Sequence, residues 1–336
     1  MQYVSELIQV GLCVSIAALL SHSLNVHAQS DRPIKIRFAH VVAEETPKGR
    51  MALRFKQLVK ERLGDSRVIV EVYPNGELFK DDVIGDEILK GNAELGAPSM
   101  SKIKKFSTRF QVLDIPFLFV TPEAADNFLQ GPYGKRMLRL VEPAGLKGLG
   151  YLNNGMKQLS ASQPIKTPQD VKGLKFRIMN SDVLEDQFKQ VEALPIRKPF
   201  GQVYGLLKTG EIDGQENTWS NIYSKKFYEY QPYIVESNHG YLGYMIFSSV
   251  KFWNSLPNDI RPVVEQALAD ALEYGNQVAN EKVVSDRQRI LDTNKSEIHI
   301  MTLDERKAWV KAMQPVWQTY EDEIGSELIQ AAASAR

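Results

Sequence analysis

Cysteine and histidine are scarce in this chain of 336 residues, which contains one Cys and five His. A single Cys cannot form a disulfide within the chain, so the disulfide-rich frameworks of small secreted domains are excluded. Scattered His residues without Cys partners also argue against a structural zinc site, and we expect no bound metal. The chain has no excess of one charge either, because 41 Lys and Arg balance 41 Asp and Glu. We therefore expect no nucleic-acid partner and predict that any charged ligand is recognised locally.

The motifs of several common chemistries are also absent from the sequence. It contains no P-loop, no G-x-G-x-x-G after a strand, no H-E-x-x-H, no G-x-S-x-G and no calcium-binding loop. We expect no cofactor and no catalytic residues, and we predict that the protein is not an enzyme. An exported enzyme acting on a carboxylate stays an alternative, because carboxylate pairs and His bases need no local signature.

The most apolar run of the chain lies within its first 30 residues. Ile8 to Leu20 is uncharged but too short to span a bilayer, which needs about 20 residues. It is followed by Val26-His27-Ala28, a small-residue pattern that a signal peptidase accepts. We predict that residues 1–28 are a signal peptide cleaved before Gln29, and that the mature protein is soluble and periplasmic. The lack of Lys and Arg before the run is unusual for a signal, and a buried core helix is the alternative.

The N-terminal half of the mature chain alternates strand and helix patterns. Apolar spacing, turn residues and cap residues predict strands over 34–42, 68–73 and 93–98, and helices over 47–63 and 81–90. Such a β-α-β-α-β unit with short connections is typical of a parallel, doubly wound sheet with right-handed crossovers.

A similar pattern returns after Gly148. It predicts short strands over 150–153, 173–179 and 212–216, helices over 182–191 and 199–210, a long helix over 257–291 and a last helix that opens with the capping box Thr302–Glu305. The length of the chain corresponds to about two domains. We therefore predict an α/β protein with two lobes, a cleft between them and a long helix that braces both.

Ligands of open α/β sheets bind beyond the carboxyl ends of the strands, where helix N-termini also point free N–H groups. This geometry places four polar residues at the mouth of the crevice: His40, Thr46, Lys48 and Ser99. Plainer interpretations exist, since Thr46 fits a helix cap, Lys48 a solvated first-turn side chain and His40 a core histidine. The basic cluster that follows is interpreted as a solvated face; it consists of Lys102, Lys104, Lys105 and Arg109.

The strand predicted over 173–179 directs Arg177 to the side opposite Phe176 and Ile178. An Arg near the end of a strand offers a fork of N–H donors that matches a carboxylate. A small carboxylic acid is therefore the ligand that we expect from this stretch. The alternative is an Arg on a solvated sheet edge.

Seven segments of the chain, in order and at compatible spacing, resemble the periplasmic solute-binding proteins of TRAP transporters, most closely the DctP-type C4-dicarboxylate binders. They are Phe38–Gly49, Val70–Asn75, Ala97–Ser99, Asn154–Gln158, Gly173–Arg177, Gly214–Asn217 and Asn238–Tyr244. The resemblance implies an α/β, two-lobe, type II-like binding-protein fold in which each lobe is a doubly wound mixed sheet and a long helix spans both lobes. It also implies discontinuous lobes: residues 29–154 plus about 243–282 form lobe I, and residues 155–242 plus about 283–336 form lobe II.

The resemblance further implies a set of ligand contacts. Arg177 resembles the carboxylate-clamping arginine of the family, and Asn217 resembles its partner from the opposite wall. Lys157 matches a position that is basic in many members and is a candidate for the same or a second carboxylate. The residues that resemble first-lobe contacts are His40, Lys48 and Ser99. Members that hold a 2-oxo acid through a metal have an aromatic residue where Asn217 stands, so direct binding without a metal is expected.

These expectations combine into a predicted function. The protein is expected to be the extracytoplasmic solute-binding component of a TRAP transporter, to act as a monomer and to deliver succinate, fumarate or malate to integral membrane subunits. Another organic acid, such as a 2-oxo acid, a sugar acid or an aromatic acid, is an alternative, because one Arg reads one carboxylate and pocket shape decides the rest. A sensor subunit that docks onto a signalling receptor is a further alternative.

Overall fold

The computed structural model describes residues 32–336. The predicted signal peptide, residues 1–28, lies outside the described residues. Among residues 32–336, none of the helices combines the length and the apolar character that crossing a membrane requires.

The described residues form one mixed sheet of nine strands in the order β2-β1-β3-β8-β4-β7-β5-β6, with β9 paired to β8. The strands are β1 (Ile34–Ala39), β2 (Val68–Tyr73), β3 (Leu95–Gly96), β4 (Leu146–Ala161), β5 (Lys175–Ile178), β6 (Leu194–Arg197), β7 (Gly214–Asn217), β8 (Tyr233–Ser249) and β9 (Glu297–Ile300). Each of the two lobes is a mixed sheet, as predicted, and the two share β4 and β8.

The first lobe has the parallel arrangement that the sequence predicts. β1 pairs in parallel with β2 along its whole length, and it pairs in parallel with β3 on its other side. β3 spans two residues instead of the predicted six. The reason is local: Pro98 has no N–H to donate to a ladder, and the chain then turns into the 3₁₀ helix η2 (Met100–Lys102).

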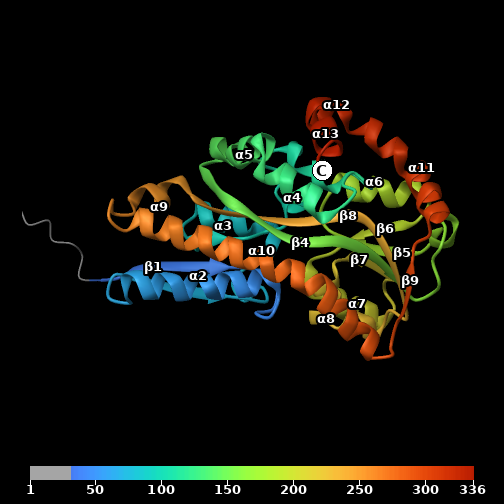
Figure 1. The fold of residues 1–336 in the computed structure, drawn as a ribbon, viewed down its shortest axis with the longest axis horizontal. Coiled ribbons are helices and arrows are strands. Elements are labelled where there is room, and N and C mark those ends of the chain that lie inside the picture. The colour runs from blue at the N-terminus through green and yellow to red at the C-terminus, as the bar shows by residue number, and fades with distance from the viewer. Residues whose placement is uncertain (1–31) are drawn as a thin grey trace, which may run out of the picture.

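β4 and β8 are long antiparallel strands that cross the middle of the molecule and connect the two lobes (Figure 1). The sequence predicts only the short strand 150–153 within β4, because the second half of β4 is buried on both faces and shows no alternation. The ladder shifts register between Asn153 and Met156, where Gly155 has a φ of 96° that favours glycine. This bulge lies at the predicted boundary between the lobes.

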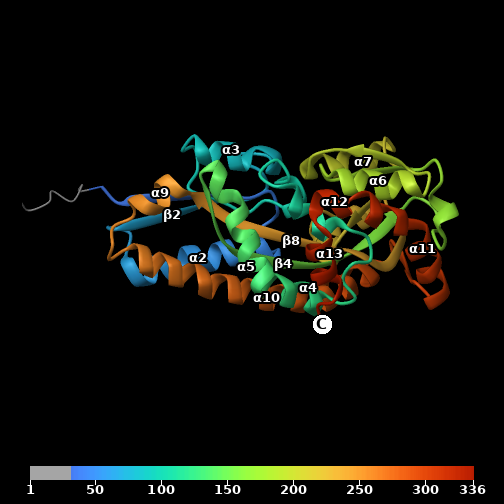
Figure 2. The same cartoon turned by 90° about the horizontal axis from the view of Figure 1, so that it is seen from above.

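Helices cover both faces of the sheet (Figures 1 and 2). The α-helices are α2 (Pro47–Leu63), α3 (Ile84–Leu89), α4 (Pro122–Gln130), α5 (Pro132–Leu138), α6 (Asp182–Gln190), α7 (Val203–Thr209), α8 (Trp219–Ser224), α9 (Val250–Ser255), α10 (Arg261–Asp292), α11 (Leu303–Thr319), α12 (Glu321–Ile324) and α13 (Ser326–Ala333). The 3₁₀ helices used below are η1 (Asp81–Val83), η2, η3 (Thr108–Asp114) and η6 (Phe200–Gln202). Thr46 accepts the N–H of Gly49 at 3.2 Å, so it is the N-cap of α2.

The long helix α10 runs beneath both lobes, as the sequence predicts (Figure 2). It packs against α2 and β4, and Gly275 lies at a close approach to both. A Cβ atom at that position would lie 2.7 Å from side-chain atoms of both Met51 and Leu152, so the contact needs glycine. The helix thereby joins the N-terminal layer to the strands that link the lobes.

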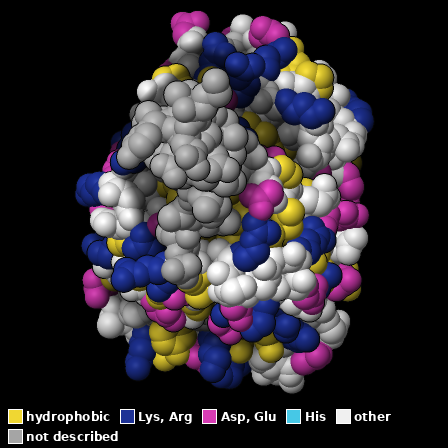
Figure 3. Space-filling view, turned by 90° about the vertical axis from the view of Figure 1, so that its left-hand side faces the viewer, with side chains coloured by type: hydrophobic (Ala, Val, Ile, Leu, Met, Phe, Trp, Pro, Cys, Tyr) yellow, Lys and Arg dark blue, Asp and Glu magenta, His cyan; other side chains and the backbone are white. Residues whose placement is uncertain are grey.

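Charged side chains of both signs are distributed over the surface. On the face shown in Figure 3, basic and acidic side chains are interspersed, in keeping with the balanced composition.

Candidate functional site

A narrow, partly open cavity of about 20 Å³ lies between the two lobes. Most of its lining residues come from the carboxyl ends of strands and from the segments that follow them, as the topology predicts: Val41, Val42, Asp81, Ser99, Lys102, Arg177, Met179, Phe200, Asn217 and Asn221. Leu242 and Tyr244, from the middle of β8, complete the lining. Three of the predicted site residues, Ser99, Arg177 and Asn217, lie together in this lining. The other three lie behind it.

Arg177 sits on β5 with 1% of its surface exposed. Its Nε donates to the carbonyl of Lys198 at 2.9 Å, whereas Nη2 is buried and has no hydrogen-bond partner among the described residues. Burial lowers the pKa of Arg177 to about 10, although the negative charges of Glu216, Asp82 and Asp81 oppose that shift. The side chain is therefore a desolvated cation at neutral pH, with a donor directed into a cavity.

Asn217 ends β7 and is held in one orientation by the helix that follows it. Its Oδ1 accepts hydrogen bonds from Asn221 Nδ2 at 2.7 Å and from the N–H of Thr218 at 3.2 Å. Because the oxygen is engaged, the NH₂ group is the part of the side chain available to a ligand oxygen. Asn217 thus adds a neutral donor beside the charged one.

Lys102 corrects the interpretation of the basic cluster as a solvated face. Only 5% of Lys102 is exposed, it lines the cavity, and its Nζ lies 3.4 Å from Asp82 Oδ2. Lys104 and Lys105 do reach the surface, where they pair with Asp182 and Asp86. The sequence did not single out Lys102, because the charged residues that follow it reach the surface. Its position three residues after Ser99 could have indicated that it lies on the same side as Ser99, since both belong to one 3₁₀ turn.

His40 and Lys48 lie behind the cavity wall, and both are fully buried. Lys48 Nζ donates to the carbonyl of Ala97 at 2.7 Å and lies 3.6 Å from the centre of the Tyr244 ring. Burial lowers the pKa of Lys48 to about 8. Burial, reinforced by the charge of Lys48, lowers the pKa of His40 to about 3, so His40 is neutral and supplies no charge. The ring of Tyr244 that Lys48 contacts is part of the cavity lining.

Lys157 lies outside the cavity lining and has a carboxylate partner within the protein. Its Nζ lies 2.9 and 2.8 Å from the two oxygens of Glu216, which also contacts His239 Nε2 at 2.9 Å. Burial alone would raise the pKa of Glu216, but Lys157 and His239 lower it to about 2. This buried cluster joins β4, β7 and β8 directly beneath Asn217. The sequence places Lys157 near the site, and the structure pairs it with Glu216.

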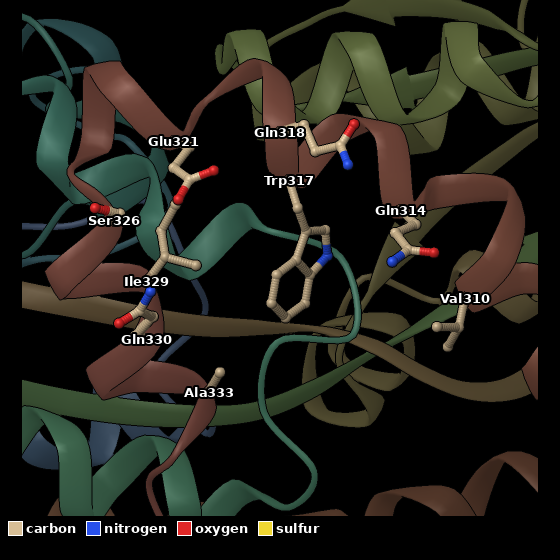
Figure 4. A pocket seen from close by; sticks show the side chains of 9 residues that line it. All are labelled: Val310, Gln314, Trp317, Gln318, Glu321, Ser326, Ile329, Gln330 and Ala333. Atoms are coloured by element: carbon tan, nitrogen blue, oxygen red, sulfur yellow. The ribbon is translucent and has the colours of Figure 1, made fainter.

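A second, more open groove lies among the C-terminal helices α11, α12 and α13 (Figure 4). Trp317 stands at its centre, and its Nε1 donates to the carbonyl of Pro116 at 2.9 Å. Glu321 is the charged side chain among the described residues that line this groove. The groove therefore offers no cation for an organic acid, and the interlobe cavity is the better candidate.

Comparisons with known proteins show which family the chain belongs to. Residues 38–323 match the sequence profile of the bacterial extracellular solute-binding proteins, family 7. A C4-dicarboxylate-binding periplasmic protein DctP from Shewanella loihica is 51% identical over 327 residues, which are 97% of this chain and 96% of that protein.

Two solved structures are also similar over most of the chain. A TRAP periplasmic solute-binding protein from Shewanella oneidensis, with bound succinate, has a TM-score of 0.89 and 49% identity, covering 90% of this chain and 99% of that one. Another from Pseudomonas aeruginosa, with bound L-malate, has a TM-score of 0.83 and 39% identity, covering 86% of this chain and 100% of that one. The chain therefore belongs to family 7 of the bacterial extracellular solute-binding proteins, the DctP-type binding proteins of TRAP transporters.

Proposed function

We propose that the protein captures a C4-dicarboxylate, such as succinate, fumarate or malate, in the interlobe cavity and performs no chemistry on it. The observation that carries this proposal is the pair of buried cations in the cavity lining, Arg177 from β5 and Lys102 from η2. A buried cation is costly unless an anion compensates it, and two cations on opposite lobes suit a ligand with two carboxylates. The similar structures from Shewanella oneidensis and Pseudomonas aeruginosa contain succinate and L-malate, which supports a C4-dicarboxylate as the ligand.

Each carboxylate of the ligand is bound by one charged and one neutral side chain. Arg177 clamps the first carboxylate, and the NH₂ group of Asn217 donates to it. Lys102 and the hydroxyl of Ser99 hold the second, and the Ser99 Oγ is buried without a hydrogen-bond partner in the described part of the chain. These ion pairs gain strength when the cleft closes, because closure removes water from around them.

The remaining predicted residues support this lining in our proposal. Lys48 raises the positive potential behind Ser99 and Tyr244, and Lys157 neutralises Glu216 so that no free carboxylate lies beneath Asn217. His40 stays neutral and fills space beside Lys48. Replacement of these residues is expected to affect the ligand indirectly, through the shape of the lining.

The lobes are proposed to divide as the sequence predicts, with lobe I comprising 29–154 and about 243–282. The boundaries then fall inside β4, β8 and α10, which are continuous elements. Bending is expected at the irregular positions of the two strands, Gly155 with a φ of 96° and Asn238 with a φ of 46°. Closure around the ligand would present a surface that the open form lacks.

Delivery to the integral membrane subunits of a TRAP transporter, in the periplasm, completes the proposed role. It requires export, which we assign to residues 1–28. Mass spectrometry of the protein recovered from the periplasm tests the signal, and an N-terminus at Gln29 is the expected result. Uptake of a dicarboxylate into vesicles that carry the membrane subunits should require this protein.

Calorimetric titration tests the ligand class. The mature protein is unfolded, freed of bound ligand and refolded, and then titrated with succinate, fumarate, malate, a C4 monocarboxylate and a 2-oxo acid. We expect the dicarboxylates to bind with micromolar or lower Kd and the monocarboxylate not to bind. A folded protein that binds the monocarboxylate equally well would contradict the two-carboxylate site.

A further inference from the structure

One side chain of the cavity has the wrong charge for a dicarboxylate. Asp81, the first residue of η1, lines the interlobe cavity together with Arg177 and Lys102. Only 6% of Asp81 is exposed. Its Oδ1 is buried and accepts no hydrogen bond from any residue in the range 32–336.

Asp81 is also placed where a ligand passes. It lines both the cavity and the adjoining groove between the lobes, which runs past Asn75 and Lys80 on one side and Phe200 to Gln202 on the other. The carboxylate therefore lies at the junction between the cavity and the outside. A ligand in the cavity must contact it or leave it desolvated.

The neighbouring lysines make their contacts with groups other than the Asp81 carboxylate. Lys102 has its ion pair with the adjacent Asp82, at 3.4 Å, and Lys48 donates to the carbonyl of Ala97. Burial lowers the pKa of both Lys48 and Arg177, and the negative charge of Asp81 opposes that shift. Asp81 thus shares the cavity with the cations and lacks a donor of its own.

An ionised carboxylate only accepts hydrogen bonds. It would repel a carboxylate of the ligand, and a methylene group would leave it buried and unpaired. A hydroxyl group on the ligand is the donor that a small organic acid can bring. We infer that Asp81 is a specificity-determining residue that accepts a hydrogen bond from a ligand hydroxyl, so that the site prefers hydroxy-dicarboxylates to unsubstituted ones. This inference rests on the proposed function, because it concerns the same cavity.

The expected discrimination follows from the cost of an unpaired acceptor. Sites built to bind a hydroxyl reject the analogue that lacks it, because their own polar group is left buried without a partner. A hydrogen bond to a charged group corresponds to a factor of about 10 to 100 in affinity. We expect one enantiomer of malate to bind more tightly than succinate by about this factor.

The test is the ratio of two dissociation constants, measured by calorimetry on the full-length mature protein. D- and L-malate and succinate are titrated into the wild type, Asp81→Ala and Asp81→Asn. Asp81→Ala should bring the Kd values of malate and succinate to within about threefold of each other. Succinate should bind to this variant as tightly as to the wild type or more tightly, because a charge that repels its carboxylates has been removed. Asp81→Asn keeps an acceptor oxygen and should retain part of the preference.

The control is Asp86→Ala, which removes a nearby acid that pairs with Lys105 on the surface. It should leave the ratio unchanged. If Asp81 only balances the charge of the lysines, Asp81→Ala will weaken both ligands by the same factor and the inference is overturned. Equal affinity of the wild type for malate and succinate also overturns it, yet leaves the proposed function intact. Binding of neither ligand by the folded wild type contradicts the proposed function itself.

Discussion

Four buried cations near the cavity differ in what compensates them, and this difference decides their roles. Lys157 is neutralised by Glu216, and Lys48 donates to a backbone carbonyl. Lys102 has a long contact with Asp82, and Arg177 keeps one buried nitrogen without a partner among residues 32–336. Because an uncompensated buried charge is unfavourable, Arg177 and Lys102 gain most from an anionic ligand.

Replacement of Arg177 should separate its charge from its geometry. Arg177→Ala leaves a ligand carboxylate buried and unpaired, which costs about 2–5 kcal/mol and weakens succinate binding about 30-fold to several-thousand-fold. Arg177→Lys restores the charge but not the fork, so it should recover only part of the loss. Calorimetric titration of the two variants measures both effects, and retained tight binding by Arg177→Ala would contradict the clamp.

Lys102→Met tests the second carboxylate. It should weaken succinate at least about tenfold, because one carboxylate loses its only cation in the lining, and it should leave the melting temperature nearly unchanged. Lys105→Met is the matched control from the same cluster, since Lys105 pairs with Asp86 at the surface. Equal effects of the two substitutions on the Kd would remove Lys102 from the site.

Asp126 should make stability depend on pH. It accepts hydrogen bonds from Tyr241 at 2.9 Å and Asn153 at 3.1 Å, and burial raises its pKa to about 6. The folded state therefore binds a proton more tightly than the unfolded state, in which an aspartate has a pKa of about 3.9. Stability must then fall as the pH rises from about 4 to about 6.

Asp126→Asn is the control, because it replaces the titrating carboxyl group with an amide that does not titrate in this pH range. The free energy of unfolding of the wild type, relative to the variant, should decrease by about 2 kcal/mol between pH 4 and pH 6.5, after allowance for partial solvent exposure. Urea unfolding at a series of pH values measures it. A difference that stays constant over this range would show that Asp126 has an ordinary pKa.

The sequence identifies Arg177 because the strand pattern suffices to direct this side chain to the face opposite Phe176 and Ile178. It does not identify Lys102 or Asp81. Both stand among other charged residues, and only the 3₁₀ turns η1 and η2 bury them while their neighbours reach solvent. Burial of a charge is a tertiary property, and no local pattern reports it.

At the scale of elements, the close contact of α10 with α2 and β4 holds the two lobes on one support. Gly275 makes this contact possible, since a Cβ there would meet Met51 and Leu152 at 2.7 Å. Alanine is favoured over glycine in helices by about 1 kcal/mol, but overpacking costs about 1–3 kcal/mol. The packing term should therefore outweigh helix propensity at this position.

Gly275→Ala should accordingly lower the free energy of unfolding by about 1–2 kcal/mol. Gly205 in α7 offers the opposite case, because its added Cβ would meet no atom within 4 Å. Gly205→Ala should raise stability by about 0.5–1 kcal/mol. Urea denaturation of both variants measures the difference, and a stabilising Gly275→Ala would show that α10 and α2 can move apart freely.

The elements that the sequence predicts well are those with one buried face. α2 and α6 have apolar periodicity and N-cap side chains, and β1 and β2 have apolar alternation; the structure confirms all four. The sequence predicts only a short part of β4 and misses β8, because both strands are buried on both faces in the middle of the sheet. For such a strand, apolar alternation disappears, and its length depends on what packs on either side.

At the scale of the whole molecule, the proposed lobes are joined by β4, β8 and α10 and also meet across the cavity. On one side Lys104 pairs with Asp182, and on the other Lys225 Nζ donates to Asn75 Oδ1 at 3.0 Å. These contacts flank the cavity without touching it. A ligand that bridges Arg177 and Lys102 would add a third link between the lobes, which is how binding favours closure in our proposal.

The central claim is that one ligand carboxylate meets Arg177 and the other meets Lys102. A crystal structure of the refolded protein with succinate tests it most directly. We predict carboxylate oxygens within about 2.7–3.1 Å of the Arg177 Nη atoms at one end of the ligand and of Lys102 Nζ at the other. A succinate that binds elsewhere, or whose second carboxylate contacts Lys157 in place of Lys102, would contradict the account.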